Sequence, residues 1–167
     1  MLIILVLLII IAFIISVSIY GFLMFISWIY SRKLLHVDPQ KYQFAVSLSQ
    51  NSQFTKGKVK FRVCYHPYLQ SDIAFVHILS PCTVFIALSY LNDPYLDVII
   101  AHELGHIENR VKYSTKSVKM EMIEEIKADF FSVKICGKKR VLESSEYHDI
   151  SKIRRKMIIE MRDRFRT

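Results

Sequence analysis

The chain opens with a long apolar run. Residues 1–31 carry no charged side chain, and Arg32 and Lys33 follow directly. As a helix the run would be roughly 45 Å long, against roughly 30 Å of bilayer hydrocarbon, so it could cross a membrane once with tilt. A cleaved signal peptide would need a basic start and a shorter apolar core, and a buried core helix is a second alternative. The pattern favours a single transmembrane helix over residues 1–31.

The apolar pattern changes its period after this run. Residues 32–57 are polar with weak periodicity, and they predict a juxtamembrane linker with one short helix. Residues 58–65 alternate apolar and basic side chains, which is typical of a half-buried strand. Residues 73–79 and 83–90 are two more β-rich runs, and the Ser-Pro pair between them favours a hairpin.

Three helices are expected after the strands. The first covers about residues 94–108, behind the capping sequence Asn-Asp-Pro, and the second covers about 118–136, before Gly137 at a C-cap position. The third covers about 149–165. The predicted fold class is α+β, with a small β-sheet plus about three helices behind the transmembrane anchor. The predicted parts are an anchor, a juxtamembrane linker and one domain, over residues 1–31, 32–57 and 58–167.

Charge and cysteine content narrow the choice of partners. The net charge is +8, and all of it comes from residues after 31. No nucleic-acid motif accompanies this charge, so we expect a basic face near a lipid bilayer and no nucleic acid as a partner. Arg32 and Lys33 behind the apolar run predict a cytoplasmic domain on a single-pass anchor. The odd count of three cysteines agrees with a reducing compartment.

The first predicted helix carries the candidate chemistry. Its apolar arc contains Glu103, and His102 and His106 lie together at the border of that arc. A buried carboxylate without a partner costs several kcal/mol. Histidines at positions i and i+4 on one helix face can bind one zinc ion, and the glutamate between them then faces the metal-bound water. The alternative is a helix with two satisfied core histidines and a salt-bridged Glu103.

A zinc ion would give Glu103 a role. Zinc lowers the pKa of its water from about 15.7 towards about 7. Glu103 can then accept the proton as a general base and later deliver it to the leaving amine. Gly105, within the same motif, removes a side chain where another element would need to pass close.

A third ligand is expected on the second helix. Glu125 and Asp129 lie one turn apart at the edge of its apolar stripe, whereas Glu124 points away. We therefore predict one zinc ion per chain, held by His102, His106 and Glu125. Asp129 is the expected acceptor for the other ring nitrogen of a ligand histidine. The alternative is an ordinary solvated pair of carboxylates.

The last predicted helix places Arg154 within its apolar arc, with His148 just upstream. A buried arginine needs an anionic partner. Either residue could stabilise an oxyanion in the active site, so both are candidate catalytic residues beside Glu103. The alternative for Arg154 is a side chain whose stem is buried and whose head reaches water.

Taken together, these motifs resemble the HtpX and CAAX-prenyl-protease family of zinc metallopeptidases. "AHELGHIENR" is similar to the family's active-site helix, "EIKAD" to its E-x-x-A-D motif, and "HDISKIRR" to its segment with a histidine and an arginine. The resemblance covers residues 72–157. It implies a minimal zincin-like fold, Glu125 as third ligand and Asp129 behind a ligand histidine. The HExxH motif with its downstream E-x-x-x-D also resembles the soluble repressor-cleaving metallopeptidases of mobile elements.

The sequence thus predicts a membrane-anchored zinc endopeptidase that cleaves polypeptide substrates, with its domain in the cytoplasm. We expect the β-rich run Thr83–Tyr90 to be the edge strand that binds an extended peptide. The alternatives are a non-catalytic membrane adaptor with a degenerate or structural zinc site, and a repressor-cleaving metallopeptidase of a mobile element.

Overall fold

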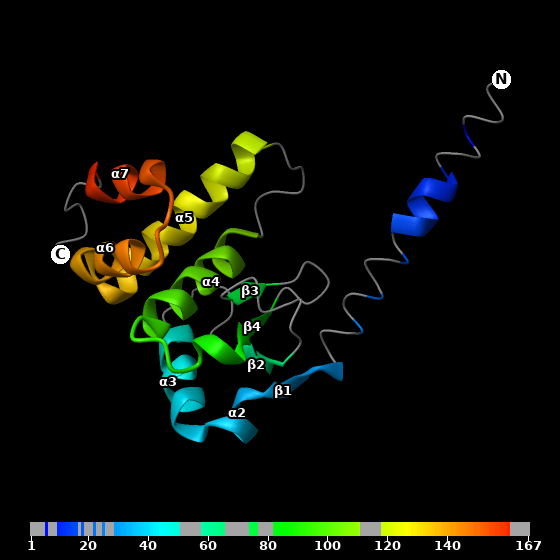
Figure 1. Cartoon of the computed structure of the whole chain (residues 1–167), viewed down its shortest axis with the longest axis horizontal. Coiled ribbons are helices and arrows are strands. Elements are labelled where there is room, and N and C mark those ends of the chain that lie inside the picture. The colour runs from blue at the N-terminus through cyan, green and yellow to red at the C-terminus, as the bar shows by residue number, and fades with distance from the viewer. Residues whose placement is uncertain are drawn as a thin grey trace.

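The computed structural model describes most of the chain: residues 6, 10–16, 18, 22, 25, 29–50, 58–65, 74–76, 82–110 and 118–160. This part is predominantly helical, with a small sheet against which the first long helix packs (Figure 1). The strands are β1 (Ser31–Lys33), β2 (Lys60–Cys64), β3 (Ala74–Val76) and β4 (Thr83–Ala87). The helices are α2 (Leu34–Val37), α3 (Pro39–Ser49), α4 (Leu96–Arg110), α5 (Val118–Cys136), α6 (Lys138–Tyr147) and α7 (Lys152–Glu160), with a 3₁₀ turn at Leu88–Tyr90.

The four described strands form one mixed sheet in the order β1-β2-β4-β3. Strand β1 pairs antiparallel with β2, β2 pairs parallel with β4, and β4 pairs antiparallel with β3. All five residues of β4 are buried. A strand with partners on both sides and both faces covered reads as a continuous apolar run, as "TVFIA" does.

The core lies between the sheet and α4. The apolar arc of α4 includes Ile100 and Leu104, which are fully buried against the fully buried Val63, Val84 and Ile86 of the sheet. Full burial of such a side chain contributes about 1.5–3 kcal/mol. This packing fixes the rotation of α4, so the border of its apolar arc turns towards α5.

Helices α4 and α5 cross at Gly105. A Cβ atom built on Gly105 would lie 2.7 Å from the Cα of Ala128 and 3.0 Å from the Cβ of Phe131. Real Cβ atoms do not approach other atoms so closely, so only glycine allows this crossing. The expectation that Gly105 lets another element pass close is therefore confirmed.

The segment expected to be a linker joins the core instead. Asp38 begins α3 by accepting hydrogen bonds from the backbone N–H groups of Gln40 and Lys41 at 3.1 and 3.0 Å, and Pro39 follows at the first helical position. Leu34 of α2 and Ala45 of α3 are fully buried in the core.

Helices α6 and α7 complete the described part. Gly137, with φ of 85°, separates α5 from α6, as its predicted C-cap position requires. Val98 of α4, Val141 of α6 and Ile158 of α7 form a second apolar cluster. Helix α6 was not expected, because residues 138–147 are too polar to show a wide apolar stripe.

The predicted fold class was wrong. Among the described residues, no helix is long and apolar enough to cross a membrane, so the expected transmembrane helix over residues 1–31 is corrected. Ser31, at the end of that run, belongs to β1 and lies opposite Cys64 of β2. Because the backbone there takes part in sheet pairing, the run does not stay helical to its end. The described part is also more helical than expected, since residues 34–49 form two helices, α2 and α3, where one short helix was predicted, and α6 was not predicted at all.

The predicted edge strand was also wrong. Strand β4, within the run Thr83–Tyr90, lies between β2 and β3, and residues 88–90 form a 3₁₀ turn. The order of the described strands places β3 and β1 at the two ends of the sheet. A peptide cannot pair with β4, because both of its sides already have partners.

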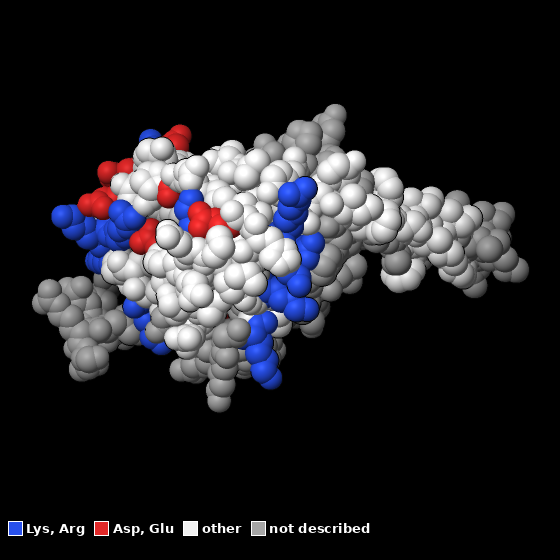
Figure 2. Space-filling view, turned by 90° about the horizontal axis from the view of Figure 1, so that it is seen from below, with Lys and Arg blue, Asp and Glu red and all other residues white. Residues whose placement is uncertain are grey.

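Part of the positive charge lies on the sheet. The exposed basic residues there are Arg32 and Lys33 of β1, Lys58, and Lys60 of β2. Figure 2 shows Lys and Arg gathered beside the N-terminal segment, and both signs of charge mixed at the opposite end. Arg62 differs from these, because it is buried and donates hydrogen bonds to the side chain and carbonyl of Ser31.

Candidate metal centre

Two helices bring the three predicted ligands together. His102 and His106 come from α4, and Glu125 comes from α5. The two Nε2 atoms are 3.1 Å apart. The Glu125 carboxylate lies 3.3 Å from His102 Nε2 through Oε2 and 3.2 Å from His106 Nε2 through Oε1. This group could hold a metal ion.

The spacing of these atoms fits a small tetrahedral ion. Ligand atoms about 2.0–2.1 Å from zinc, at tetrahedral angles, lie about 3.3 Å from one another. The observed separations are 3.1, 3.2 and 3.3 Å. Two imidazoles and one carboxylate are also a donor set that zinc accepts, with a fourth position left for another ligand.

Asp129 lies where the sequence predicted it, behind His102. Its Oδ1 is 2.9 Å from His102 Nδ1, and the carboxylate is almost fully buried. In the neutral ring, an Nδ1–H that donates to Asp129 would leave the Nε2 lone pair available to a metal ion. Asp129 therefore sets both the tautomer and the orientation of the His102 ring.

Glu103 is buried beside this group. Glu103 is only 7% exposed, although its side chain is a carboxylate. Burial lowers the pKa values of His102 and Arg154, hydrogen bonds to Asp129 outweigh it, and the charge of Glu103 adds to the rise in both. This burial agrees with the sequence expectation that the carboxylate faces inward.

Arg154 approaches the centre from α7 and contacts two acids of α5. Its Nη1 is 2.9 Å from Glu125 Oε2, and its Nε and Nη2 donate to the two oxygens of Asp129 at 2.8 and 2.7 Å. The anionic partners that the buried arginine requires are therefore Glu125 and Asp129. The sequence analysis missed this pairing, although the i, i+4 spacing of two acids signals a need for a cation.

His148 lies in a different environment. It caps the C-terminus of α6, and its Nε2 is 3.4 Å from Asp93 Oδ1, at the start of α4. The rings of Tyr90, Tyr95 and Tyr147 surround it at centroid distances of 6.0, 6.3 and 4.9 Å. Among the described residues, none of these partners belongs to the metal-binding group. The structure thus brings Arg154 to the group but places His148 among other contacts.

The electrostatics of the group favour its charged forms. Burial alone would lower the pKa of His102, but hydrogen bonds to Asp129 and Glu125 and the charges of Glu103 and Asp129 raise it to about 9. Burial would raise the pKa of Glu125, yet hydrogen bonds from His102 and His106 hold it well below its usual range. The pKa of Asp129 is likewise lowered, because hydrogen bonds from Arg154 and His102 outweigh burial.

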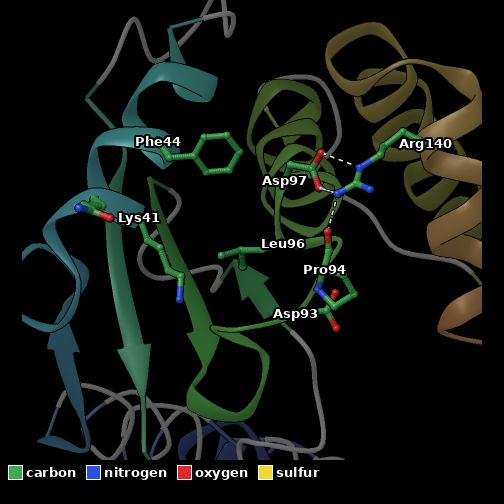
Figure 3. A pocket seen from close by; sticks show the side chains of 8 residues that line it. Lys41, Phe44, Asp93, Pro94, Leu96, Asp97 and Arg140 are labelled. Atoms are coloured by element: carbon green, nitrogen blue, oxygen red, sulfur yellow. Dashed lines mark hydrogen bonds and ion pairs between the residues drawn. The ribbon is translucent and has the colours of Figure 1, made fainter.

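A separate cavity lies at the N-terminal end of α4. Its volume is about 410 Å³, and its walls come from α3, α4, the turn before α4, and α6 (Figure 3). Its charged side chains all have partners: Arg140 binds Asp97 at 3.1 Å, Lys41 donates to Asn92 at 2.6 Å, and Asp93 lies 3.4 Å from His148. None of the three candidate metal ligands lines this cavity.

Comparisons with known proteins do not add a family to this geometry. No family model, no curated protein and no solved structure matches the chain. The resemblance noted in the sequence therefore rests on its short motifs alone.

Proposed function

We propose that this protein is a zinc-dependent peptide hydrolase. The observation that carries the proposal is the group of His102, His106 and Glu125, whose ligand atoms lie 3.1–3.3 Å apart on two packed helices. A buried glutamate, Glu103, stands within the same helical turn as the two histidines. This combination supports hydrolysis more strongly than a structural metal site, since a structural zinc usually has four protein ligands.

The donor set favours zinc over other common ions. Magnesium and calcium prefer all-oxygen sites, whereas two imidazoles and a carboxylate suit zinc. When bound, the ion supplies Lewis-acid chemistry, lowering the pKa of a water molecule and polarising a carbonyl. One ion per chain is expected, because the described residues offer one such group.

Two residues of the protein have roles in the proposed reaction besides the three ligands. Glu103 accepts a proton from the attacking water and passes it to the leaving amine. Asp129 holds His102 in the tautomer that leaves Nε2 available as a ligand. A polypeptide substrate is proposed from the motifs "AHELGHIENR" and "EIKAD", which resemble those of zinc metallopeptidases.

Metal analysis combined with a single conservative substitution tests this function. Purified wild type should contain about one zinc per chain and cleave an unstructured casein-type substrate. Glu103→Gln should keep its fold and its zinc but lose at least about 10²-fold in cleavage rate, because only the proton acceptor is removed. Glu143→Gln makes the same chemical change at a half-exposed position of α6, away from the candidate ligands, and serves as the control.

The results separate an enzyme from an adaptor. Equal cleavage by wild type and Glu103→Gln would refute the general-base mechanism. A zinc-loaded wild type that cleaves none of a broad set of unstructured polypeptides would favour the non-catalytic alternative.

A further inference from the structure

We propose that Arg154 is a positioning residue that ties α7 to the metal centre and sets its affinity for zinc. The inference rests on the proposed function, because it concerns the same three ligands. It gives Arg154 a role different from oxyanion stabilisation, the role expected from the sequence.

Three neighbouring carboxylates lie on the two helices that carry the candidate ligands. Glu125 and Asp129 are one turn apart on α5, and Glu103 lies close by on α4. Like charges at i and i+4 repel each other, and burial strengthens that repulsion. Without Arg154 only the histidines would oppose this repulsion, and Glu125 should shift from the position in which it faces both of them.

Arg154 has the geometry to prevent this rearrangement. Its Nε and Nη2 meet both oxygens of Asp129 at 2.8 and 2.7 Å, while Nη1 reaches Glu125 Oε2 at 2.9 Å. The planar guanidinium offers several donors in a fixed arrangement, whereas a lysine offers a single point charge. One arginine side chain therefore fixes the orientation of two carboxylates at once.

The contact extends to the histidine ligand. Asp129 Oδ1 accepts from Arg154 Nη2 at 2.7 Å and lies 2.9 Å from His102 Nδ1. Arg154 thereby acts on His102 through Asp129 and on Glu125 directly. Two of the three candidate ligands depend on its position.

Arg154 also links the last described helix to the site. On α7, Ile153, Met157 and Ile159 are between 42% and 58% exposed, and Ile158 is the only buried residue. Because this apolar contact is small, the hydrogen bonds and ion pairs of Arg154 contribute an important share of the docking of α7. Because metal binding and the docking of α7 use the same two carboxylates, each should favour the other.

Substitutions at two neighbouring positions of α7 test the inference. Arg154→Met keeps a long side chain but removes the charge and the donors. Arg154→Lys keeps the charge and cannot bridge both carboxylates. Arg155→Met is the matched control, since Arg155 pairs with Glu146 of α6 instead. The full chain is used throughout, and circular dichroism of the metal-free proteins checks that each variant folds.

Zinc affinity is measured by competition with a chelator, and the geometry of the centre by the visible absorption spectrum of the Co²⁺-substituted proteins. Arg154→Met should lose about 10–100-fold in zinc affinity and change the Co²⁺ spectrum, as expected for loss of a residue behind the ligands. Arg154→Lys should lose less affinity but still change the spectrum. Arg155→Met should behave like wild type in both measurements.

The outcomes distinguish this inference from the proposed function. Unchanged affinity and an unchanged Co²⁺ spectrum in both Arg154 variants would overturn the positioning role. If such variants also lost cleavage, Arg154 would act on the reacting atoms instead. A wild type that binds neither zinc nor Co²⁺ would overturn the metal centre itself, and this inference with it. Should Arg154→Met fail to fold, the spectrum of Arg154→Lys decides the question.

Discussion

Gly105 of α4 and Ala128 of α5 are in direct backbone contact, since a Cβ on Gly105 would lie 2.7 Å from the Ala128 Cα and 2.9 Å from its carbonyl oxygen. Glu125 is one turn before Ala128 on α5, and Asp129 is the next residue. The closeness of this crossing therefore sets how far the two acids reach towards the histidines.

Gly105→Ala should weaken both the fold and the metal centre. Alanine gains about 1 kcal/mol in helix propensity over glycine, but the atoms in its way are backbone atoms that cannot rotate aside. We expect a net destabilisation of about 1–3 kcal/mol and a clear loss of zinc affinity, because α5 must move away from α4. Denaturant titration and chelator competition measure the two effects.

Gly137→Ala provides the control for this prediction. Nothing lies within 4 Å of a Cβ at Gly137, but its φ of +85° is strained for alanine. It should lose about 1 kcal/mol of stability with no change in zinc affinity. If both variants lost zinc affinity to the same extent, the helix crossing would not be what positions the ligands.

Glu125→Ala should abolish most zinc binding, whereas Glu124→Ala should not. Glu125 faces both histidines at 3.2 and 3.3 Å, and Glu124 is its direct neighbour on the same helix. The two variants make the same substitution at neighbouring positions, and only Glu125→Ala is expected to lose zinc. Metal analysis after dialysis gives the result, and full zinc retention by both variants would show that Glu125 is not the third ligand.

The residues that could hold a metal ion could be predicted from sequence, because the rules that select them are local. His102 and His106 share a helix face at i and i+4, and the stripe of α5 selects Glu125 and Asp129 over Glu124 in the same way. Only the meeting of the two helices is non-local, and Gly105 signalled it. The sequence therefore predicted the group of His102, His106 and Glu125, with Asp129 beside it, but not the separate position of His148.

The strand order, the pairing of Ser31 and the positions of His148 and Arg154 depend on long-range partners that local sequence patterns do not reveal. Nothing local in residues 83–87 shows that β2 pairs on one side of them and β3 on the other. Ser31 ends an uncharged run, yet its pairing with Cys64 is a long-range choice. His148 and Arg154 share one motif, but a helix boundary between them sends their side chains to different acids, Asp93 and Asp129.

His148→Phe should reduce stability more than cleavage. His148 is 7% exposed on its side chain and lies against Asp93, which also caps α4 through the backbone N–H of Tyr95 at 2.7 Å. Its loss removes this 3.4 Å ion-pair contact, although His148 Nε2 makes no hydrogen bond to Asp93 and Asp93 keeps the bond from Tyr95, so we expect a cost of about 1 kcal/mol. We expect this loss of stability, with kcat/KM staying within about threefold of wild type. Loss of a catalytic hydrogen-bond donor would instead lower kcat/KM about 10²-fold.

His36→Phe is the matched control, because His36 is exposed on α2 and should change neither quantity. A 10²-fold fall in kcat/KM for His148→Phe at unchanged stability would instead support the oxyanion role expected from the sequence.

The metal-free protein should lose stability in alkaline solution as His102 gives up its proton. Hydrogen bonds to Asp129 and Glu125 outweigh burial and raise the pKa of His102 to about 9, from 6.5 in the unfolded chain. A group whose pKa is raised on folding stabilises fully below the unfolded value and loses that contribution as pH rises through the folded value. The window is therefore about pH 6.5–9, and the loss is at most about 3 kcal/mol.

Zinc affinity should depend on pH in the opposite direction from the stability of the metal-free protein, because zinc competes with the proton for Nε2 of His102. Between about pH 6.5 and 9, apparent zinc affinity should rise, with release of a proton on binding below the pKa of His102. Thermal unfolding of metal-free protein across pH 6–9.5, and zinc titrations in buffers of different ionisation enthalpy, measure the two trends. His102→Gln should remove the alkaline slope of the metal-free protein. A metal-free wild type whose stability stayed flat across this range would show that His102 is neutral in the folded state.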